Sequence, residues 1–298
     1  MADWLCYTFS EKQNNLKEDT MTQLEFTKMH GLGNDFILVE EKKLPSNVNY
    51  EQLSKKLCDR HFGIGGDGLI VVRSRNAVKE ADTAWRIFNA DGTEPEMCGN
   101  GIRCFAKYVY DRNLIDKAKF TVSTLAGLIT PVVEESGMIT VDMGEPVLTP
   151  AEIPVNIAGD RIIDYPLNVL DKTFRINCVS MGNPHCIIFV DEPVDAVKYG
   201  TAIENHSVFP RRTNVEFVQV LSKSHIKVNV WERGCGITLA CGTGACACVV
   251  AAVINKLTAR KIKVTLPGGE LFINYDRDSG RLYMTGPAEY AFEGSLYL

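Results

Sequence analysis

The sequence predicts an α/β fold of the α+β type, with two pseudo-symmetric domains that each wrap a mixed or antiparallel sheet around a central helix. A Cys-Gly-x-Gly segment that runs into apolar, helix-forming residues occurs twice, at Cys98 and at Cys241. Both following helices are apolar around most of their circumference, as helices buried on all sides are. The chain has 298 residues, which suits two domains with separate cores.

The composition excludes several classes of protein. Apolar residues make up 45% and charged residues 23%, as in ordinary globular proteins. A net charge of −5 without a basic cluster argues against a nucleic-acid partner. No apolar run reaches the roughly 20 residues that cross a bilayer, so we expect no membrane partner.

Most of the ten cysteines are expected to be free, buried thiols, because a chain of this length does not need disulfides to stabilise its core. No signal-peptide pattern is visible, which predicts a cytoplasmic location where thiols stay reduced. The cysteines contain no Cys-x-x-Cys pair and the chain has only five His, so we expect no metal site.

The first half begins after an extension, residues 1–22, that we expect to be poorly ordered. Its helices are predicted at 50–60 and 100–112 from apolar spacing. Its strands are predicted at 24–29, 36–40, 69–73, 84–89, 120–124, 128–134 and 138–143. The strands at 120–124 and 128–134 are predicted to form a hairpin. A break at 143–146 predicts a domain boundary there.

The second half repeats this plan loosely. Helices are predicted at 195–204 and 243–257. Strands are predicted at 175–181, 186–191, 215–221, 226–233, 261–266, 270–275, 282–286 and 288–297. The glycines at 63–68 precede a strand rather than a helix, so a Rossmann nucleotide site is disfavoured.

The two cysteine segments predict one site. Each pair of glycines lets the chain turn sharply into a helix whose first N–H groups can bind a carboxylate. The same position lowers the pKa of a thiol. We call each Cys-Gly-x-Gly turn, together with the start of the helix that follows it, a corner. If the two corners face each other, Cys98 and Cys241 would suit removal of a proton from one face of a carbon and its return from the other face. Small buried side chains remain the alternative for either cysteine alone. A phosphate-binding turn is disfavoured because no Gly-Lys-Ser/Thr follows.

Several polar residues are candidates for holding a ligand. Amide side chains both donate and accept, which suits an amino acid, although each Asn alone is explained as a turn former. Glu232 and Arg233 form either an exposed ion pair or a clamp for an ammonium and a carboxylate. His185 is either structural or part of the site. The four asparagines are Asn34, Asn89, Asn183 and Asn214.

These motifs resemble the diaminopimelate epimerase family over about residues 24–298. The matching segments are Lys-Met-His-Gly-Leu-Gly-Asn-Asp-Phe (28–36), Phe-Asn-Ala-Asp-Gly (88–92), Cys-Gly-Asn-Gly-Ile-Arg-Cys (98–104), Met-Gly-Asn-Pro-His (181–185), Trp-Glu-Arg-Gly (231–234), Ala-Cys-Gly-Thr-Gly-Ala-Cys (240–246) and Leu-Pro-Gly-Gly (266–269). The resemblance implies a cofactor-independent enzyme that converts LL-2,6-diaminopimelate to the meso isomer, for lysine and peptidoglycan, with Cys98 and Cys241 as thiolate base and thiol acid.

The resemblance also implies the roles of the other residues. The reacting carboxylate would lie on the amides of Gly99, Asn100, Gly242 and Thr243. The distal end of the substrate would be held by Asn34, Asn89, Asn183, Asn214, Glu232 and Arg233, with His185 nearby. A homodimer is expected, and the last strand is expected to return to the first domain, giving domains of 23–142 plus 288–298 and 143–287. Gly68 and Leu239 depart from some relatives, which carry Gln and a polar residue there.

Three alternatives remain from the residues. A proline or hydroxyproline racemase-like enzyme uses a similar cysteine pair but does not need a distal clamp such as Arg233. A non-catalytic amino-acid-binding protein would not require Cys98 and Cys241. A thiol redox protein is ranked last because these cysteines are remote in sequence and lack Cys-x-x-Cys.

Overall fold

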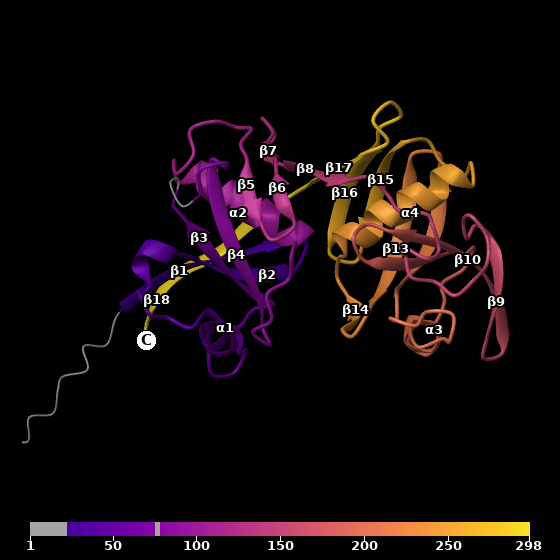
Figure 1. Cartoon of the computed structure of the whole chain (residues 1–298), viewed down its shortest axis with the longest axis horizontal. Helices are drawn as coiled ribbons and strands as arrows, with labels where there is room; N and C mark the ends of the chain where they lie inside the picture. Colours follow the sequence, from indigo (N-terminus) through magenta and orange to yellow (C-terminus); the bar gives the residue numbers. More distant parts are fainter. Residues whose placement is uncertain (1–22, 75–77) are drawn as a thin grey trace, which may run out of the picture.

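A computed structural model describes residues 23–74 and 78–298. Two groups of strands lie side by side, and each surrounds one long helix (Figure 1). The prediction for residues 1–22 lies outside the described residues. The α+β fold with two pseudo-symmetric domains is confirmed, and each half contains one central helix packed against strands.

The first sheet has seven strands among the described residues and ends in β18 on one side and β6 on the other. Their order across the sheet is β18 (Glu289–Tyr297), β1 (Gln23–Gly31), β2 (Asn34–Glu40), β3 (Gly68–Arg73), β4 (Thr83–Asn89), β5 (Val122–Thr124) and β6 (Gly127–Ile129).

The second sheet has eleven strands in the part of the chain that is described. Ten follow one path, and β14 (Gly236–Thr238) pairs with β13 beside it. The path is β7 (Val132–Val133), β8 (Ile139–Gly144), β17 (Leu282–Gly286), β16 (Gly269–Tyr275), β15 (Lys261–Leu266), β13 (His225–Glu232), β12 (Asn214–Ser222), β11 (Pro184–Phe189), β10 (Lys172–Ser180) and β9 (Tyr165–Val169).

The pseudo-symmetry is visible in the strand directions. From β1 to β6 the successive pairs are antiparallel, parallel, antiparallel, parallel and antiparallel. The series β10, β11, β12, β13, β15 and β16 repeats this alternation. Each parallel pair needs a crossover, and a helix lies within each of them. These helices are α1 (Tyr50–Cys58), α2 (Gly99–Asp111), α3 (Ala196–Glu204) and α4 (Gly242–Ile254).

The central helices are α2 and α4, which follow the equivalent strands β4 and β13. The residues of α4 from Gly244 to Ala252 are all buried, which explains why its sequence has no polar face. The 3-10 helix η1 (Glu41–Lys43) has no buried residue. Helix α4 ends at Ile254, three residues before the predicted end, because Asn255 caps Ala251 O and Lys256 adopts a φ of 58°.

One predicted strand, 128–134, is wrong. It is divided into β6 and β7, which belong to different sheets. Pro131 lies between them and has no N–H to donate to a strand ladder, so the chain leaves the first sheet there. The predicted hairpin is therefore limited to β5 and β6.

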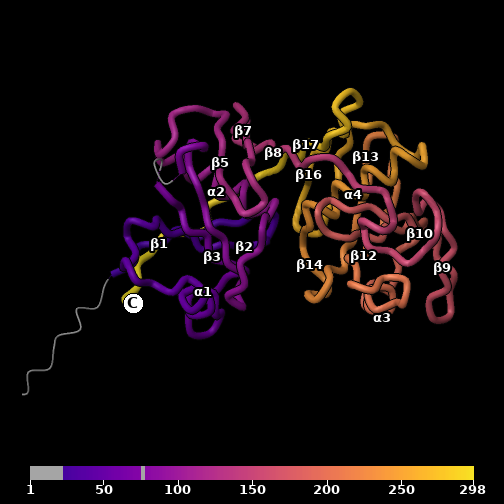
Figure 2. The backbone as a smooth tube through the Cα atoms, in the orientation of Figure 1, coloured from indigo at the N-terminus to yellow at the C-terminus, as the bar shows by residue number. Residues whose placement is uncertain are grey.

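The chain passes between the two halves more than once. Strand β8 pairs with β17 in the second sheet, while its Ile139 and Val141 pack into the core around α2. Strand β18 then runs back from the second half and pairs with β1, as the yellow end of the tube shows (Figure 2). The domain boundary at residue 143 stays a prediction.

Among the described residues, no helix combines the length and apolar character needed to cross a membrane.

Gly268 lies where the halves touch, in the turn between β15 and β16. Its N–H donates to Leu239 O at 2.8 Å, and a methyl group on its Cα would lie 2.1 Å from Leu32 O of the first half. We expect Gly268→Ala to destabilise the protein by about 1–3 kcal/mol, because backbone atoms cannot move aside as a side-chain tip can. Urea unfolding measures this. Gly280→Ala, at an open position with a φ of 70°, is the control for backbone strain alone.

Candidate active site

The two cysteine corners have nearly the same backbone geometry. Cys98 precedes α2 with φ −141° and ψ 114°, and Cys241 precedes α4 with φ −125° and ψ 111°. Each is therefore the extended residue that opens its helix. The sulfur of Cys98 accepts a hydrogen bond from Gly101 N at 3.4 Å, and the sulfur of Cys241 lies 3.4 Å from Thr243 Oγ1.

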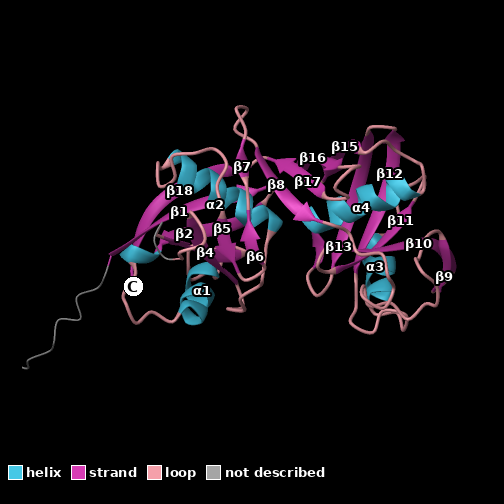
Figure 3. Ribbon diagram, turned by 45° about the horizontal axis from the view of Figure 1, so that its top comes forward, coloured by secondary structure: helices cyan, strands magenta, loops and turns pink. Residues whose placement is uncertain are grey.

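The two helix N-termini face each other. A methyl group at Gly242 would lie only 3.9 Å from the Cα of Gly99. Figure 3 shows α2 and α4 end to end at the junction of the two groups of strands. Met284 of β17 lies beside both ends, since its side chain would contact a methyl group at either glycine. Free N–H groups and the positive ends of two helix dipoles therefore converge on one place, which suits an anion.

Asn100 joins the two corners. Its Nδ2 donates to Asn34 Oδ1 at 3.0 Å and to Ala240 O, next to Cys241, at 3.4 Å. The sulfur of Cys98 lies 3.9 Å from the same Asn34 oxygen. The structure therefore brings Asn34 and Asn100 to the cysteines through direct contacts.

Asn34 is held by a network of acidic and basic side chains that was not predicted from the sequence. Its Nδ2 donates to Asp67 Oδ2 at 2.7 Å, and Asp67 is paired with Arg60 at 2.9 Å. Arg60 and the buried Lys28 also pair with Asp35. Burial would raise the pKa of the Asp35 carboxyl, but the hydrogen bonds from Arg60 and Lys28 lower it to about 2.

A second cluster lies on β11, β12 and β13. His185 and Asn214 are direct partners in the parallel register of β11 and β12. Asn183 Oδ1 lies 2.9 Å from His185 Nε2. Asn214 Oδ1 accepts the backbone N–H of Arg233 at 2.9 Å, so it fixes the chain at the end of β13. Glu232 Oε1 accepts from Thr238 Oγ1 at 2.6 Å.

The side chains of two predicted site residues form hydrogen bonds to residues outside the predicted site. Asn89, at the end of β4, donates to Thr93 Oγ1 at 2.9 Å. Arg233 is exposed, donates to Arg211 O at 3.2 Å and forms no ion pair within the described ranges. Its guanidinium is therefore available to a ligand carboxylate.

The two departures from relatives have structural consequences. Gly68 lies beside Phe36 and Asn89 in the sheet, and a methyl group there would lie 2.8 Å from Phe88 O. Any side chain at this position thus requires the strand to shift. Leu239 is half exposed and reaches across the halves, with Cδ1 2.6 Å from the methyl position of Gly33.

Burial is the largest cause of the pKa shifts of Cys98, Cys241 and Glu232. It raises the pKa of the Cys98 thiol, while hydrogen bonds from the amides of Gly101 and Asn100 lower it in part. Burial also raises the pKa of the Cys241 thiol well above its usual value. The negative charges of Glu232 and Glu216 act in the same direction. Burial also raises the pKa of Glu232, and hydrogen bonds from Thr238 and Cys241 oppose that rise.

Two buried charged residues beside the corners were missed in the sequence. Arg103 of α2 and Glu216 of β12 are both fully buried. Each stands among apolar residues of its own element, which was the available signal, since Lys, Glu, Arg and Asp are almost never fully buried unless paired.

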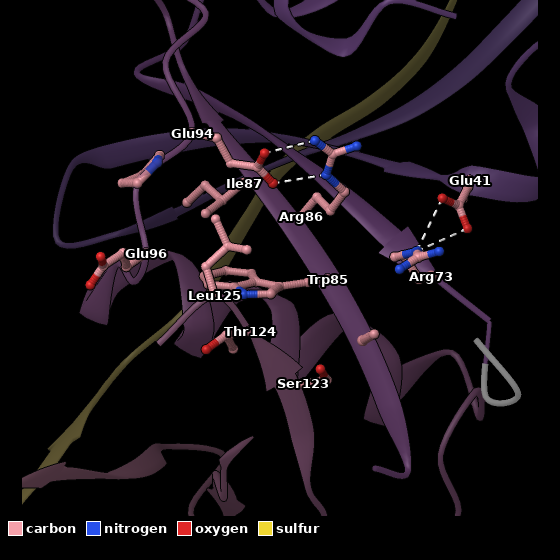
Figure 4. A pocket seen from close by; sticks show the side chains of 12 residues that line it. Glu41, Arg73, Trp85, Arg86, Ile87, Glu94, Glu96, Ser123, Thr124 and Leu125 are labelled. Atoms are coloured by element: carbon pink, nitrogen blue, oxygen red, sulfur yellow. Dashed lines mark hydrogen bonds and ion pairs between the residues drawn. The ribbon is translucent and has the colours of Figure 1, made fainter. Parts of the chain in front are cut away.

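A separate hollow contains none of the predicted residues. It lies along β4, with Trp85 and Leu125 among its lining residues (Figure 4). Four of its five charged side chains are paired, Arg86 with Glu94 at 2.7 Å and Arg73 with Glu41 at 3.1 Å, and the fifth is Glu96. Paired charges leave little to attract a polar ligand, so we do not place the site here.

The fold defines the class of this protein. A phenazine biosynthesis protein of the PhzF family from Bacillus anthracis superposes with a TM-score of 0.67 at 18% identity, covering 93% of this chain and all of that one. A hydroxyproline epimerase from Agrobacterium vitis superposes with a TM-score of 0.66 at 12% identity, covering 93% of each chain. The protein is therefore of the two-domain α+β class to which these structures belong.

The sequence comparisons identify the family within this class. The family model "Diaminopimelate epimerase" matches residues 26–149 and 177–291. A diaminopimelate epimerase of Desulfitobacterium hafniense is 50% identical over 281 residues, covering 92% of this chain and 98% of that protein. This chain belongs to the diaminopimelate epimerase family.

Proposed function

We propose that this protein is an isomerase that interconverts LL- and meso-2,6-diaminopimelate, a step in lysine and peptidoglycan precursor biosynthesis, without a cofactor. The observation that carries the proposal is the convergence of two cysteine-capped helix N-termini, with Gly99 Cα within 3.9 Å of the methyl position of Gly242. The family of the chain supplies the substrate.

In the proposed mechanism one cysteine removes the α-proton as a thiolate and the other returns a proton from the opposite face as a thiol. The roles exchange when the reaction runs backward. The α-proton of an amino acid is weakly acidic, so charge that develops on the carboxylate must be stabilised. The amides of Gly99, Asn100, Gly242 and Thr243, at the positive ends of two helices, support this role.

The distal end of the substrate requires a separate set of contacts. The Arg233 guanidinium is proposed to bind the distal carboxylate in a bidentate manner, and Glu232 to meet the distal ammonium group. Asn34, Asn89, Asn183 and Asn214 are proposed to complete this end, with His185 nearby. These residues lie at strand ends or in the turns that adjoin them.

A proline or hydroxyproline racemase-like activity is the second candidate, because the hydroxyproline epimerase structure shares the fold. Its cyclic substrate has no second carboxylate. The exposed Arg233 without an acidic partner in the described chain favours a substrate with two carboxylates.

The test is NMR of the reduced protein with LL-diaminopimelate in heavy water, with no added cofactor. Deuterium at the α-carbon together with the meso isomer supports the proposal. Exchange of proline instead would overturn it in favour of the racemase. No exchange with either would leave an amino-acid-binding protein. Reducing agent is required because Cys98 and Cys241 can otherwise join in an inactivating disulfide.

We also propose a cytoplasmic location for the protein, because thiols stay reduced in that compartment.

A homodimer is also proposed, and β18 is the surface that supports it. Within residues 23–74 and 78–298 this strand is an open edge of the first sheet, and it exposes Tyr290, Phe292 and Tyr297. Long open edges with apolar side chains tend to pair with another chain.

We expect Phe292→Asp to shift the protein to a monomer in analytical ultracentrifugation. Leu170→Asp, an exposed residue in the turn after β9, is the control that should leave the oligomeric state unchanged.

A further inference from the structure

Arg103 is a buried cation without an acidic partner. Its side chain is fully buried, and its donors all reach neutral acceptors: Gly99 O at 3.0 Å, Asn100 Oδ1 at 2.9 Å and Pro287 O at 3.1 Å. No carboxylate of the described chain forms an ion pair with it. A buried charge is costly unless an opposite charge compensates it, so this guanidinium favours a negative charge nearby.

Cys98 is the group placed to supply that charge. Two of the acceptors of Arg103, Gly99 and Asn100, follow Cys98 directly at the first turn of α2. The other thiols that the guanidinium affects are Cys104 and Cys246, which are fully buried. Burial raises the pKa of each of these two to about 12, so they remain protonated at ordinary pH.

Glu216 has the opposite effect at the other corner. Its Oε1 lies 2.6 Å from His185 Nδ1, while its Oε2 is buried and has no hydrogen-bond partner in the described part of the chain. A methyl group at Gly244, in the first turn of α4, would lie 2.7 Å from Glu216 Oε1 and 3.3 Å from the sulfur of Cys241. The carboxylate oxygen and the sulfur therefore both lie close to one point, the methyl position of Gly244.

The remaining charged groups add to the electrostatic difference between the Cys98 corner and the Cys241 corner. Glu232 of β13 adds a second carboxylate, which is the largest charge effect raising the pKa of Cys241, whereas at Cys98 the opposing effect of Arg103 exceeds it. His185 of β11 is the hydrogen-bond partner of Glu216. The neighbours of Cys98 on β2 and at the start of α2, Asn34 and Asn100, are neutral.

We propose that Arg103 and Glu216 make the two corners electrostatically unequal, so that Cys98 loses its proton first and Cys241 keeps its proton in the singly deprotonated enzyme. The two residues act as positioning residues for charge and do not touch the substrate. The proposal rests on the proposed two-thiol function of this site, because it assigns the resting roles of base and acid. The causes of the pKa shifts agree with it, since Arg103 lowers the pKa of Cys98 while Glu232 and Glu216 both raise that of Cys241.

The test uses the reduced full-length protein without substrate. Limiting iodoacetamide is added over a pH series, and the alkylation rate of each cysteine is followed by peptide mass spectrometry. The pH at which each rate is half maximal reports thiolate formation independently of access to the sulfur. We expect the Cys98 inflection at lower pH than the Cys241 inflection.

Glu216→Gln is the central variant because it removes the charge and keeps the shape. It is expected to lower the Cys241 inflection by about one pH unit and to move that of Cys98 less. Glu204→Gln is the matched control: Glu204 is also buried but binds Trp231 Nε1 and Gly234 N. It should leave the Cys241 inflection in place. Arg103→Met should raise the Cys98 inflection, with circular dichroism checking that it folds.

Two outcomes would overturn the inference: a Cys241 inflection at or below that of Cys98, or a Glu216→Gln variant that leaves Cys241 unmoved. Failure of the proposed function is seen separately, as absence of α-deuteration in the NMR assay. Alkylation needs no substrate, so the two failures are distinguishable.

Discussion

Replacing Cys98 or Cys241 by alanine is expected to lower the rate of diaminopimelate epimerisation by about 10³-fold or more. Positioned acid and base groups contribute roughly 10²–10⁴-fold each, and inversion needs one group on each face of the carbon. The two sulfurs are the titratable groups that cap the two facing helices. Rates are measured by NMR from both isomers.

The fold should survive both substitutions. Alanine at Cys98 removes a weak hydrogen bond from Gly101 N, and alanine at Cys241 removes a 3.4 Å contact with Thr243 Oγ1. We therefore expect changes in unfolding free energy of about 1 kcal/mol or less. Cys58→Ala, in α1 and bonded to Ser54, is the control that should keep its activity. Full activity in either corner variant would rule out the two-base mechanism.

The repeated corner was predictable because it is local. Two glycines after a cysteine and before an apolar run specify a sharp turn into a buried helix, wherever the segment occurs. The observed starts of α2 and α4, at Gly99 and Gly242, lie one residue before the predicted ones. The facing of the two helix ends was inferred from the repeat, and it depends on contacts between distant segments.

The charges around the corners were less predictable. Glu216 lies in a strand whose neighbours Val215, Phe217 and Val218 are all buried, so no alternation marked its side as polar. Its partner His185 lies on another strand, and pairing between strands is set by the whole sheet rather than by either sequence. Arg103 likewise lies among buried residues of α2. A charge inside an apolar run was the signal, but its partner was not visible.

The course of the chain between the halves could not be predicted from local patterns. Strand β8 has the alternation of an ordinary strand, and that pattern does not say which sheet it joins. Pro131 is the local signal that the preceding strand ends, since proline has no N–H to donate to a strand ladder. Strand β18 was expected in the first half only from the family resemblance, and its pairing with β1 is observed.

Arg233→Ala is expected to raise KM for diaminopimelate by about 10- to 100-fold and to change kcat much less. A hydrogen bond to a charged group contributes roughly 1.5–3 kcal/mol, and the distal carboxylate is remote from the bond that breaks. The backbone should keep its place, because Asn214 holds the N–H of residue 233 rather than its side chain. Initial rates from both isomers give the two constants.

Arg233→Lys separates charge from geometry. Lysine keeps the positive charge but lacks the planar fork that binds a carboxylate through two parallel hydrogen bonds. We therefore expect a KM between those of the wild type and the alanine variant. An unchanged KM in Arg233→Ala would contradict the clamp. The exposed guanidinium would then serve only its bond to Arg211 O, and the case for a substrate with two carboxylates would rest on the family alone.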